Sequence, residues 1–300
     1  MRILITGSNG QLGTELLRCL ELMWSEIGPI PEEYRGACVD AAGVAALDIA
    51  DAAAVDRWFS QKQYDLVFNC AAMTNVDGCE TAEEAAYAVN AVGVENLAKA
   101  SAAQGAKLVH VSTDYVFAGD TPGERVESDQ TRPVSAYGRT KLAGEKLALA
   151  ANPKTFVCRT AWLYGYAGQN FVKTMRRIGQ SLSSVNVVDD QFGNPTSAND
   201  LAHELLKLAL TDDYGIYHIT NKGTCSWAEF AKVIMAGLGL PCIVKPVTSV
   251  EYKAANPESA DRPHFSSLRN RRLEETIGDE MRPWRDALGS YLKALPELEG

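Results

Sequence analysis

The length, composition and charge of the chain describe an ordinary globular protein and exclude several classes. Its 300 residues can bury a core without disulfides or metals, either as one large α/β domain or as a large and a smaller one. A hydrophobic share of 46% and a charged share of 22% exclude a disordered tract. The net charge of −9 argues against general binding to nucleic acid or anionic membranes, and no apolar run is long enough to span a bilayer. We therefore expect a cytoplasmic protein.

The first 165 residues alternate short apolar runs with amphipathic stretches, which is typical of β-α-β units. The predicted strands are Arg2–Thr6, Ala37–Val39, Asp65–Cys70, Lys107–Ser112 and Thr155–Arg159. The predicted helices are Gln11–Leu22, Ala52–Gln63, Ala82–Gln104 and Ala136–Ala150. Because parallel strands joined by helices form right-handed crossovers, these segments predict an α/β fold with a Rossmann-type, doubly wound parallel sheet.

The second half of the chain has a looser rhythm and predicts a smaller C-terminal lobe over residues 166–300. Segments between about 181 and 220 are candidates for a return to the first domain. The predicted helices are Phe171–Gly179, Asn199–Leu210, Ser226–Gly237 with Ser226 as N-cap, and a final helix after Pro283; the predicted strands are Val185–Val188 and Gly215–Thr220.

A glycine-rich turn, TGSNGQLG, closes the first predicted strand and opens the first helix. Gly7 permits a tight turn, Gly10 lets the backbone approach a phosphate, and Gly13 lets the helix pack close to the sheet. The spacing is G-x-x-G-x-x-G and not G-x-G-x-x-G, so an ordinary glycine turn is the alternative. The position between strand and helix favours a dinucleotide pyrophosphate on the helix N-terminus.

Asp40 is the acidic residue that we expect at the end of the second strand, where it would bind the adenosine ribose. It lies farther from the glycines than the usual separation of about 20 residues, because Trp24 to Arg35 looks like an inserted loop. A surface acid is the alternative. No arginine directly follows Asp40, which favours NADH, whereas Arg35 nearby can receive a 2′-phosphate. We therefore expect use of both NADH and NADPH with a preference for NADH.

Tyr137 and Lys141 form Y-x-x-x-K, whose spacing places both side chains on one helix face. Tyr137 is the only tyrosine in the sequence with a lysine four residues later. The preceding strand ends in Thr113, at the sheet edge where ligands of open α/β sheets bind. An ammonium beside a phenol favours the phenolate, so we expect Lys141 to lower the pKa of Tyr137. The three residues together predict a catalytic group.

Several sequence blocks, in order along most of the chain, resemble the extended short-chain dehydrogenase/reductase superfamily and, within it, the dTDP-4-dehydrorhamnose reductase family. They are TGSNGQLG from Thr6, NCAA from Asn69, STDYVF from Ser112, YGRTKLAGE from Tyr137, RTAWLY from Arg159, NFVKTM from Asn170, VDDQFG from Val188, and the pairs Val89-Asn90, Pro195-Thr196 and Arg262-Pro263. The resemblance implies an NAD(P)-binding domain over residues 1–165 and a substrate-binding lobe over most of 166–300.

The resemblance implies that the 4-keto group of dTDP-4-dehydro-6-deoxy-L-mannose is reduced by NADH or NADPH to give dTDP-L-rhamnose. Tyr137 would protonate the developing alkoxide, Thr113 would hydrogen-bond the same oxygen, and Lys141 would tune Tyr137 and hold the ribose. The remaining cofactor contacts would come from Gly7, Asn9, Gly10, Gln11, Leu12, Gly13, Asp40, Asp48, Ile49, Asn69, Ala71, Ala72 and Asn90. The remaining substrate contacts would come from Thr74, Asp114, Tyr115, Trp162, Lys173 and Arg262.

One sequence pattern departs from this family. The C-terminal R-P-x-N-S pattern appears here as Arg262-Pro263-His264-Phe265-Ser266, without the asparagine.

Some relatives dimerise through a divalent cation, and Glu15 and Asp189 are acids that a Mg²⁺ ion would use, although ordinary solvated carboxylates are the favoured interpretation. We predict no metal site from the four histidines and seven cysteines, which are scattered without ligand spacing. The chain is expected to be a monomer or a homodimer.

Two other functions compete with this interpretation. One is another nucleotide-sugar enzyme of the superfamily, either a 4-epimerase or a 4,6-dehydratase. Dehydratases carry Asp-Glu directly after the threonine, whereas here Asp114 and Tyr115 follow Thr113. The other is a non-catalytic regulatory subunit of the same fold, against which the retention of Thr113, Tyr137 and Lys141 argues.

Overall fold

The computed structural model describes residues 1–298 and has a six-stranded, all-parallel sheet at its centre. The strands lie in the order β10-β5-β4-β3-β1-β2. They are β1 (Arg2–Thr6), β2 (Cys38–Ala42), β3 (Leu66–Asn69), β4 (Lys107–Thr113), β5 (Thr155–Thr160) and β10 (Gly215–His218). The central strands are apolar on both faces because helices cover both sides of the sheet. The predicted Rossmann-type fold class is confirmed.

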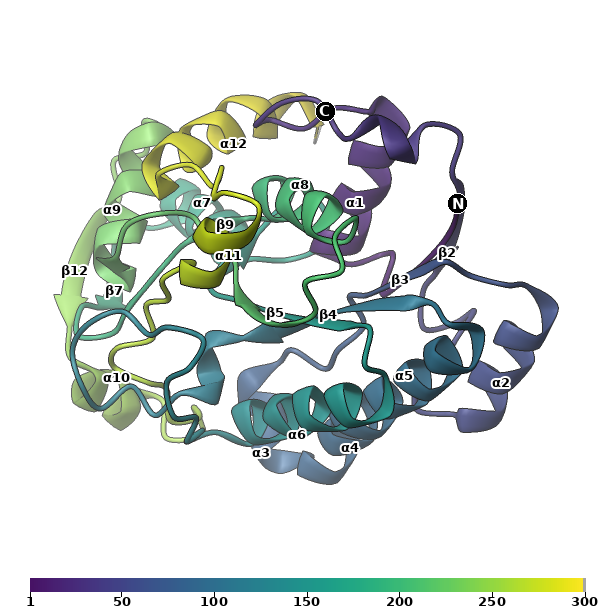
Figure 1. Ribbon diagram of the computed structural model, residues 1–300. Coiled ribbons are helices and arrows are strands. Elements are labelled where there is room, and N and C mark those ends of the chain that lie inside the picture. Colours follow the sequence, from purple (N-terminus) through teal and green to yellow (C-terminus); the bar gives the residue numbers. More distant parts are fainter. Residues whose placement is uncertain (299–300) are drawn as a thin grey trace.

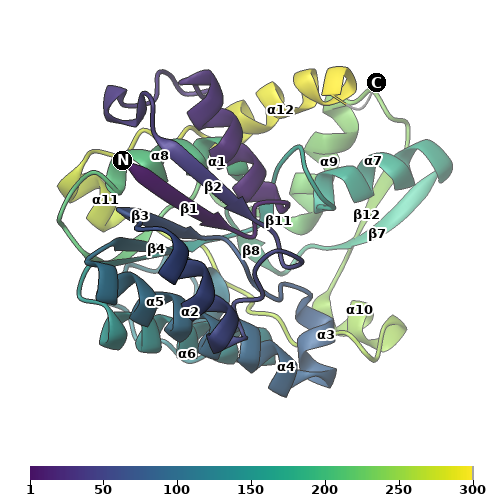
Figure 2. The same cartoon turned by 90° about the vertical axis from the view of Figure 1, so that its right-hand side faces the viewer.

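Helices form one layer on each face of the sheet (Figures 1 and 2). One layer contains α1 (Gln11–Leu22), α8 (Ala198–Leu208) and α11 (Arg271–Thr276). The other contains α2 (Ala52–Gln61), α5 (Gly93–Gln104) and α6 (Ala136–Ala151). Each layer buries its own cluster of apolar side chains against the sheet. The strand β1 and the helix α1 begin and end at the predicted residues.

The helix expected over Ala82–Gln104 is interrupted. The structure has α3 (Val76–Thr81), α4 (Glu83–Tyr87), a π-helical turn η2 (Ala88–Val92) and then α5. Gly144 of α6 explains the close approach at this turn, since a Cβ there would lie 2.1 Å from the Asn90 carbonyl oxygen. A π turn inserts one extra residue and frequently marks a functional site. The spacing of apolar residues does not reveal this π turn, because the apolar pattern continues on either side of it.

The smaller lobe lies beside the sheet (Figure 2) and has a hydrophobic core of its own. It is built from α7 (Phe171–Ser181), α9 (Trp227–Gly237), α12 (Trp284–Leu298) and a parallel pair, β7 (Ser184–Val188) with β12 (Ile243–Val247). The helix α10 (Ser249–Ala255) follows β12. Two further short pairs form separate two-stranded sheets: β6 (Leu163–Tyr164) with β9 (Thr196–Ser197), and β8 (Phe192–Gly193) with β11 (Cys225–Ser226). The predicted N-cap of α9 is confirmed, since Ser226 Oγ accepts a hydrogen bond from Glu229 N.

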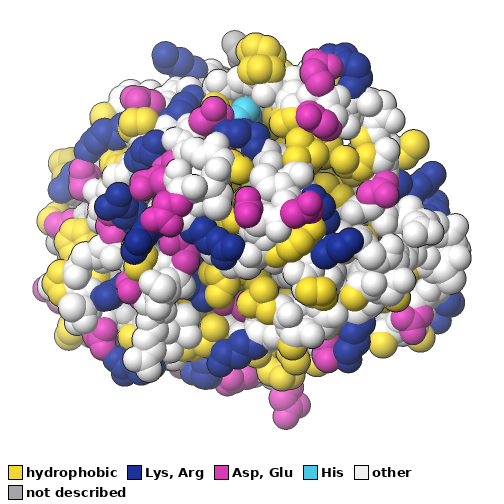
Figure 3. All heavy atoms as spheres, viewed as in Figure 1, with side chains coloured by type: hydrophobic (Ala, Val, Ile, Leu, Met, Phe, Trp, Pro, Cys, Tyr) yellow, Lys and Arg dark blue, Asp and Glu magenta, His cyan; other side chains and the backbone are white. Residues whose placement is uncertain are grey.

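The chain returns to the large sheet after β9. Helix α8 packs on α1, and β10 extends the sheet beside β5. The inserted loop between α1 and β2 packs on the same layer, where the buried Tyr34 hydroxyl donates to the Leu206 carbonyl over 2.8 Å. On the face seen in Figure 3, basic and acidic side chains are intermixed. No helix of the described residues is long and apolar enough to cross a membrane.

Candidate active site

A cavity of about 940 Å³ lies at the carboxyl ends of the parallel strands. Its walls contain most of the predicted site residues, brought together from β4, α1, α6 and the loops that follow strands β1 to β5. Those in the walls are Gly7, Asn9, Gly10, Gln11, Leu12, Gly13, Asp48, Ile49, Ala71, Ala72, Thr74, Thr113, Asp114, Tyr115, Tyr137, Lys141 and Trp162. Asp40, Asn69, Asn90, Lys173 and Arg262 are not among them.

The glycine turn fits a phosphate group. Gly7 has φ +64°, and a Cβ on it would lie 2.6 Å from the Ala71 nitrogen. A Cβ on Gly13 would lie 2.4 Å from the Gly7 carbonyl oxygen, so α1 can pack this closely only with glycine there. Gly10 is the N-cap of α1 and makes no side-chain capping bond. The amide end of the helix therefore faces the cavity and suits an anion.

Asp40 does not reach this cavity, which corrects its predicted role as the ribose ligand. The strand β2 continues to Ala42, so Asp40 lies in its middle and pairs with Leu4 of β1. Its carboxylate binds Lys62 at 2.5 Å and Arg2 at 3.1 Å. These bonds lower the pKa of Asp40 even though burial opposes them. Asp40 is therefore an ion-paired carboxylate away from the ligand edge of the sheet.

Tyr137 lies at the start of α6, where local interactions fix its position. Ser135 caps the helix by accepting from Gly138 N over 3.2 Å. Gly138 allows the helix to touch the preceding segment, since a Cβ there would lie 2.2 Å from the Tyr115 carbonyl oxygen. The rings of Tyr115 and Tyr137 then pack edge to face with centroids 5.9 Å apart. The phenol of Tyr137 is thereby held beside Thr113.

The expected lowering of the Tyr137 pKa by Lys141 is wrong for this state of the protein. Burial raises the pKa of Tyr137, and the hydrogen bond with Thr113 offsets only part of that effect. Desolvation disfavours the charged phenolate more than the polar surroundings favour it. The phenol is therefore fully protonated at neutral pH, which is the form that a proton donor requires.

Lys141 is buried one helical turn after Tyr137, and its ammonium donates to the Val111 carbonyl over 2.6 Å. Burial lowers the pKa of Lys141 to about 8, while the negative charge of Glu145 opposes that shift. The bond to Val111 aligns the lysine with the strand that carries Thr113. The ammonium is thus held at the cavity wall, between helix α6 and strand β4.

Thr113 ends strand β4 and is held by its neighbours. Its hydroxyl donates to Asp114 Oδ1 over 2.9 Å and accepts from Tyr115 N over 3.2 Å. Asp114 is buried, and its Oδ2 atom has no hydrogen-bond partner among the described residues. Burial raises the pKa of Asp114 to about 7, although hydrogen bonds from Ser266 and Thr113 favour the carboxylate. The end of β4 therefore carries two adjacent polar groups in the cavity wall.

Asn69 and Asn90 lie behind the cavity and support its walls. Asn69 accepts from Thr6 Oγ1 over 2.8 Å and from Ala71 N over 3.2 Å, so it fixes the turn after β3. Asn90 binds both backbone groups of Met73, at 2.8 and 3.0 Å, and donates to Thr140 Oγ1 over 3.2 Å. Both amides shape the backbone beside the site, which differs from the predicted direct cofactor contact.

Trp162 and Trp227 lie where this cavity adjoins a second one. Their rings stack with centroids 3.5 Å apart and planes 8° apart. Trp162 has the unusual φ of +45°, and Gly193 lies against its ring, where a Cβ would be 2.5 Å away. Trp227 lines both cavities. Trp227 is therefore shared by the two cavities, and Trp162 stacks on it from the first.

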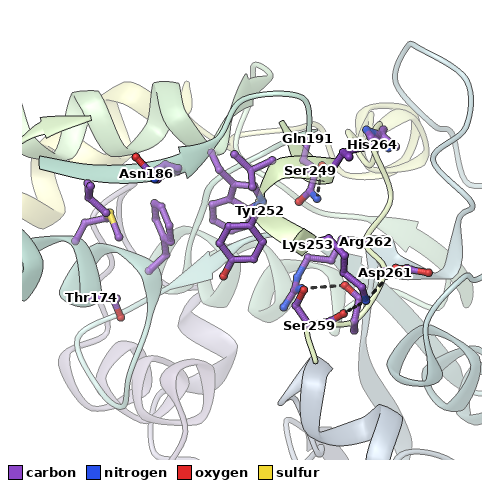
Figure 4. Close-up of a pocket in the computed structure, with 18 of the residues that line it drawn as sticks. Thr174, Asn186, Gln191, Ser249, Tyr252, Lys253, Ser259, Asp261, Arg262 and His264 are labelled. Carbon is purple, nitrogen blue, oxygen red and sulfur yellow. Dashed lines mark hydrogen bonds and ion pairs between the residues drawn. The ribbon is translucent and has the colours of Figure 1, made fainter. Parts of the chain in front are cut away.

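The second cavity measures about 730 Å³ and lies between α7, β7, α10 and residues 259–264 (Figure 4). Tyr252 projects into it, with Thr174 and Asn186 on one side and Lys253 and Arg262 on the other.

Arg262 lies in the wall of this second cavity, whereas Lys173 lines neither. Arg262 donates to Asp77 Oδ1 over 2.9 Å and to the Ala260 carbonyl over 3.1 Å. Lys173 donates to the Tyr166 carbonyl over 2.6 Å. Its ammonium is turned toward the loop that precedes α7, which differs from its predicted place at the substrate.

Comparison with known proteins decides the family. The family model described as the RmlD substrate binding domain matches residues 1–296. The dTDP-4-dehydrorhamnose reductase of Mycobacterium tuberculosis is 41% identical over 300 residues, covering 98% of this chain and 93% of that protein. The chain belongs to the dTDP-4-dehydrorhamnose reductase family.

Two solved structures of this family superpose closely on the chain. The reductase of Clostridium acetobutylicum has a TM-score of 0.92 and 44% identity, covering 99% of this chain and 100% of that one. The reductase of Bacillus anthracis in complex with NADP has a TM-score of 0.89 and 38% identity, covering 97% and 98%. The resemblance inferred from the sequence blocks is confirmed.

The departure from the reductase family's R-P-x-N-S pattern has a structural explanation. Phe265 stands where the pattern has asparagine, and its ring stacks on Phe192 with centroids 5.7 Å apart. Its backbone nitrogen donates to the Gly119 carbonyl over 3.0 Å. Packing therefore replaces a polar side chain at this position.

The two acids considered for a reductase-type metal contact are engaged elsewhere. Glu15 is buried and accepts from Asn199 over 2.8 Å, and Asp189 accepts from the Ser226 hydroxyl. Within residues 1–298, no group of three His, Cys, Asp or Glu side chains forms a candidate metal site.

Sequence reasoning missed several walls of the reductase cavity. Gly43, Val44 and Leu47 line it directly after β2. The signal that would have found them is the true end of that strand, three residues beyond the predicted Val39. Trp227 belongs to none of the sequence blocks and reaches the cavity only through the packing of α9.

Proposed function

We propose that this protein reduces the 4-keto group of dTDP-4-dehydro-6-deoxy-L-mannose to give dTDP-L-rhamnose, with NADPH as reductant and Tyr137 as proton donor. The observation that supports this most directly is the convergence of Thr113, Tyr137 and Lys141 on the cavity that also contains the glycine turn. Membership of the reductase family supports the same reaction.

The chain's own residues suit a dinucleotide. The turn from Gly7 to Gly13 would hold the pyrophosphate, and the residues after β2 and β3 would flank the adenosine and nicotinamide halves. When bound, the reduced nicotinamide supplies the hydride. The assignment of NADPH rests on the NADP complex of the Bacillus anthracis relative. It also agrees with the position of Asp40, which is too far back along β2 to repel a 2′-phosphate.

Tyr137 would deliver its proton to the oxygen on sugar C4 as negative charge develops there. Its raised pKa keeps the proton in place until that charge appears. Thr113 would donate a hydrogen bond to the same oxygen, which requires its hydroxyl to turn from Asp114. The nearby ammonium of Lys141 would stabilise the phenolate that Tyr137 becomes.

Each of the two cavities would hold one part of the substrate. The reacting sugar would lie in the first cavity beside Tyr137, and the nucleotide would extend past the Trp162 and Trp227 pair into the second. Arg262 is the basic group in that second cavity best placed to meet a diphosphate, since its guanidinium also contacts Tyr115 of the first. The carboxylate of Asp77 balances its charge until substrate binds.

The test is NADPH oxidation, followed at 340 nm, with the substrate made in situ from dTDP-glucose by the upstream dehydratase and epimerase. Consumption that requires both the substrate and this protein, together with formation of dTDP-L-rhamnose, supports the proposal. Absence of turnover with NADPH and NADH would favour a non-catalytic subunit. An absorption spectrum of the purified protein separates the epimerase alternative, which would retain tightly bound nicotinamide.

A further inference from the structure

A buried ion pair lies directly behind the catalytic residues. Arg159 of β5 donates to both carboxylate oxygens of Glu145, with Nε to Oε1 at 2.9 Å and Nη2 to Oε2 at 2.7 Å. Each side chain is only 2% exposed. Ser112 also donates to Glu145 Oε1, over 2.5 Å. A charge pair buried in this way stabilises a fold less than apolar packing of the same volume would, so its presence asks for another reason.

The geometry of the pair links every element that carries a catalytic group. Glu145 lies on α6, one turn beyond Lys141 and two turns beyond Tyr137. Ser112 and Arg159 are register partners on β4 and β5, and both reach the same carboxylate. Ser112 lies between Val111, whose carbonyl receives the Lys141 ammonium, and Thr113. Glu145 therefore fastens the helix that carries the proton donor to the strand that carries its partner.

We propose that Glu145, held by Arg159 and Ser112, is a positioning residue that fixes Lys141 against β4 and keeps its ammonium charged inside the buried site. The inference rests on the proposed reductase function and adds Glu145 and Arg159, neither of which lines either cavity.

The groups around Lys141 determine how strongly its charged form is favoured. Burial disfavours the ammonium, and Glu145 on the same helix favours it. The Cys70 thiol on the strand side is neutral, because burial raises its pKa to about 12. His110 of β4 is neutral, because burial and the lysine charge hold its pKa well below the usual value. Tyr137 is also neutral. Glu145 is thus the acidic side chain that acts on Lys141, and Arg159 is its bidentate partner.

The test is the pH dependence of kcat, measured with NADPH and substrate both saturating. Activity of the wild type should fall as pH rises through the Lys141 pKa, since the neutral amine cannot stabilise a phenolate. In Glu145→Gln the anion is lost and the Arg159 cation stays, so the midpoint of this alkaline limb should move down by about one pH unit. In Glu145→Gln/Arg159→Gln the opposing cation is gone as well, and the midpoint should fall between the other two.

Glu204→Gln is the matched control. Glu204 is a fully buried glutamate on α8 that contacts Lys207, outside the site. The same change there should alter thermal stability but leave the alkaline midpoint at the wild-type value. If Glu145→Gln does not fold, the uncharged double variant carries the test alone, because it buries no unpaired charge.

Equal alkaline midpoints in wild type and in the folded Glu145 variants, with only thermal stability reduced, would overturn the proposal and make the pair structural. Failure of the wild type to oxidise NADPH with this substrate would instead remove the proposed function. The two failures are therefore distinguishable.

Discussion

Tyr115 and Tyr137 pack edge to face in the wall of one cavity, with ring centroids 5.9 Å apart and planes at 76°. Their hydroxyls face different partners. Tyr137 is hydrogen-bonded to Thr113, whereas Tyr115 contacts the Arg262 guanidinium. The two phenols therefore have separate environments, and only that of Tyr137 suits proton donation to a group beside Thr113.

Tyr137→Phe should lower kcat by about 10²- to 10⁴-fold while substrate affinity changes little, because the hydroxyl acts mainly in the transition state. Steady-state NADPH oxidation measures this, and isothermal titration measures the affinity. Tyr115→Phe is the matched control, since it removes one hydroxyl from the partner ring. It should affect KM more than kcat. Near-normal turnover of Tyr137→Phe would reject the assigned role.

Thr113→Val should reduce kcat by about 100- to 1,000-fold, because the isosteric side chain cannot donate to the developing oxyanion. Thr113→Ser keeps the hydroxyl and should retain most of the activity. The carboxyl of Asp114 loses its 2.9 Å donor in the valine variant, so thermal unfolding is measured alongside. Equal kcat values for the serine and valine variants would show that the hydroxyl takes no part.

Gly13→Ala should weaken NADPH binding by about tenfold or more. The added Cβ would lie 2.4 Å from the Gly7 carbonyl oxygen, so the phosphate turn must shift. Quenching of tryptophan fluorescence on NADPH titration gives the Kd. Gly28→Ala is the control, because a Cβ there meets no atom within 4 Å. An unchanged Kd in Gly13→Ala would place the pyrophosphate elsewhere.

Asp40→Asn should leave the ratio of kcat/KM for NADPH and NADH unchanged within about twofold. Its carboxylate is bound by Arg2 and Lys62 and lies outside the cavity. The ratio comes from initial rates with each cofactor. A marked shift toward NADPH would restore Asp40 as the residue that reads the ribose.

Glu204→Gln should stabilise the protein at pH 8 by about 1–2 kcal/mol and by much less at pH 5. Burial raises the pKa of Glu204 from 4.5 to about 7. Because the folded pKa is raised, the stability of the protonated form is complete below pH 4.5 and is lost as pH rises through about 7. Urea unfolding at both pH values measures the difference. A gain that is the same at pH 5 and pH 8 would contradict the raised pKa.

Glu251 offers a control of opposite sign. It is an exposed residue whose pKa is lowered by the backbone amide of Thr248 in a capping box. Its contribution to stability is present at high pH and is lost as pH falls, so Glu251→Gln should cost stability at pH 8.

Local chemistry let the sequence predict the parts of the site that are built from neighbouring residues. The limits of β1 and α1 followed from an apolar run, three glycines and an amphipathic repeat within a short stretch. The i, i+4 spacing placed Tyr137 and Lys141 on one face of α6 without knowledge of the fold. These features depend on contacts only a few residues apart, which the order of amino acids determines directly.

Tertiary packing determined the features of the site that depend on contacts between residues far apart in the sequence. Asp40 lies outside the cavity because β2 pairs with β1 as far as Ala42, which places Asp40 in the middle of the strand. Trp227 lines the cavity because the packing of α9 stacks its ring on Trp162. The pKa of Tyr137 moved opposite to its expected direction because the folded chain removes water from the phenol, and desolvation depends on every group that surrounds it.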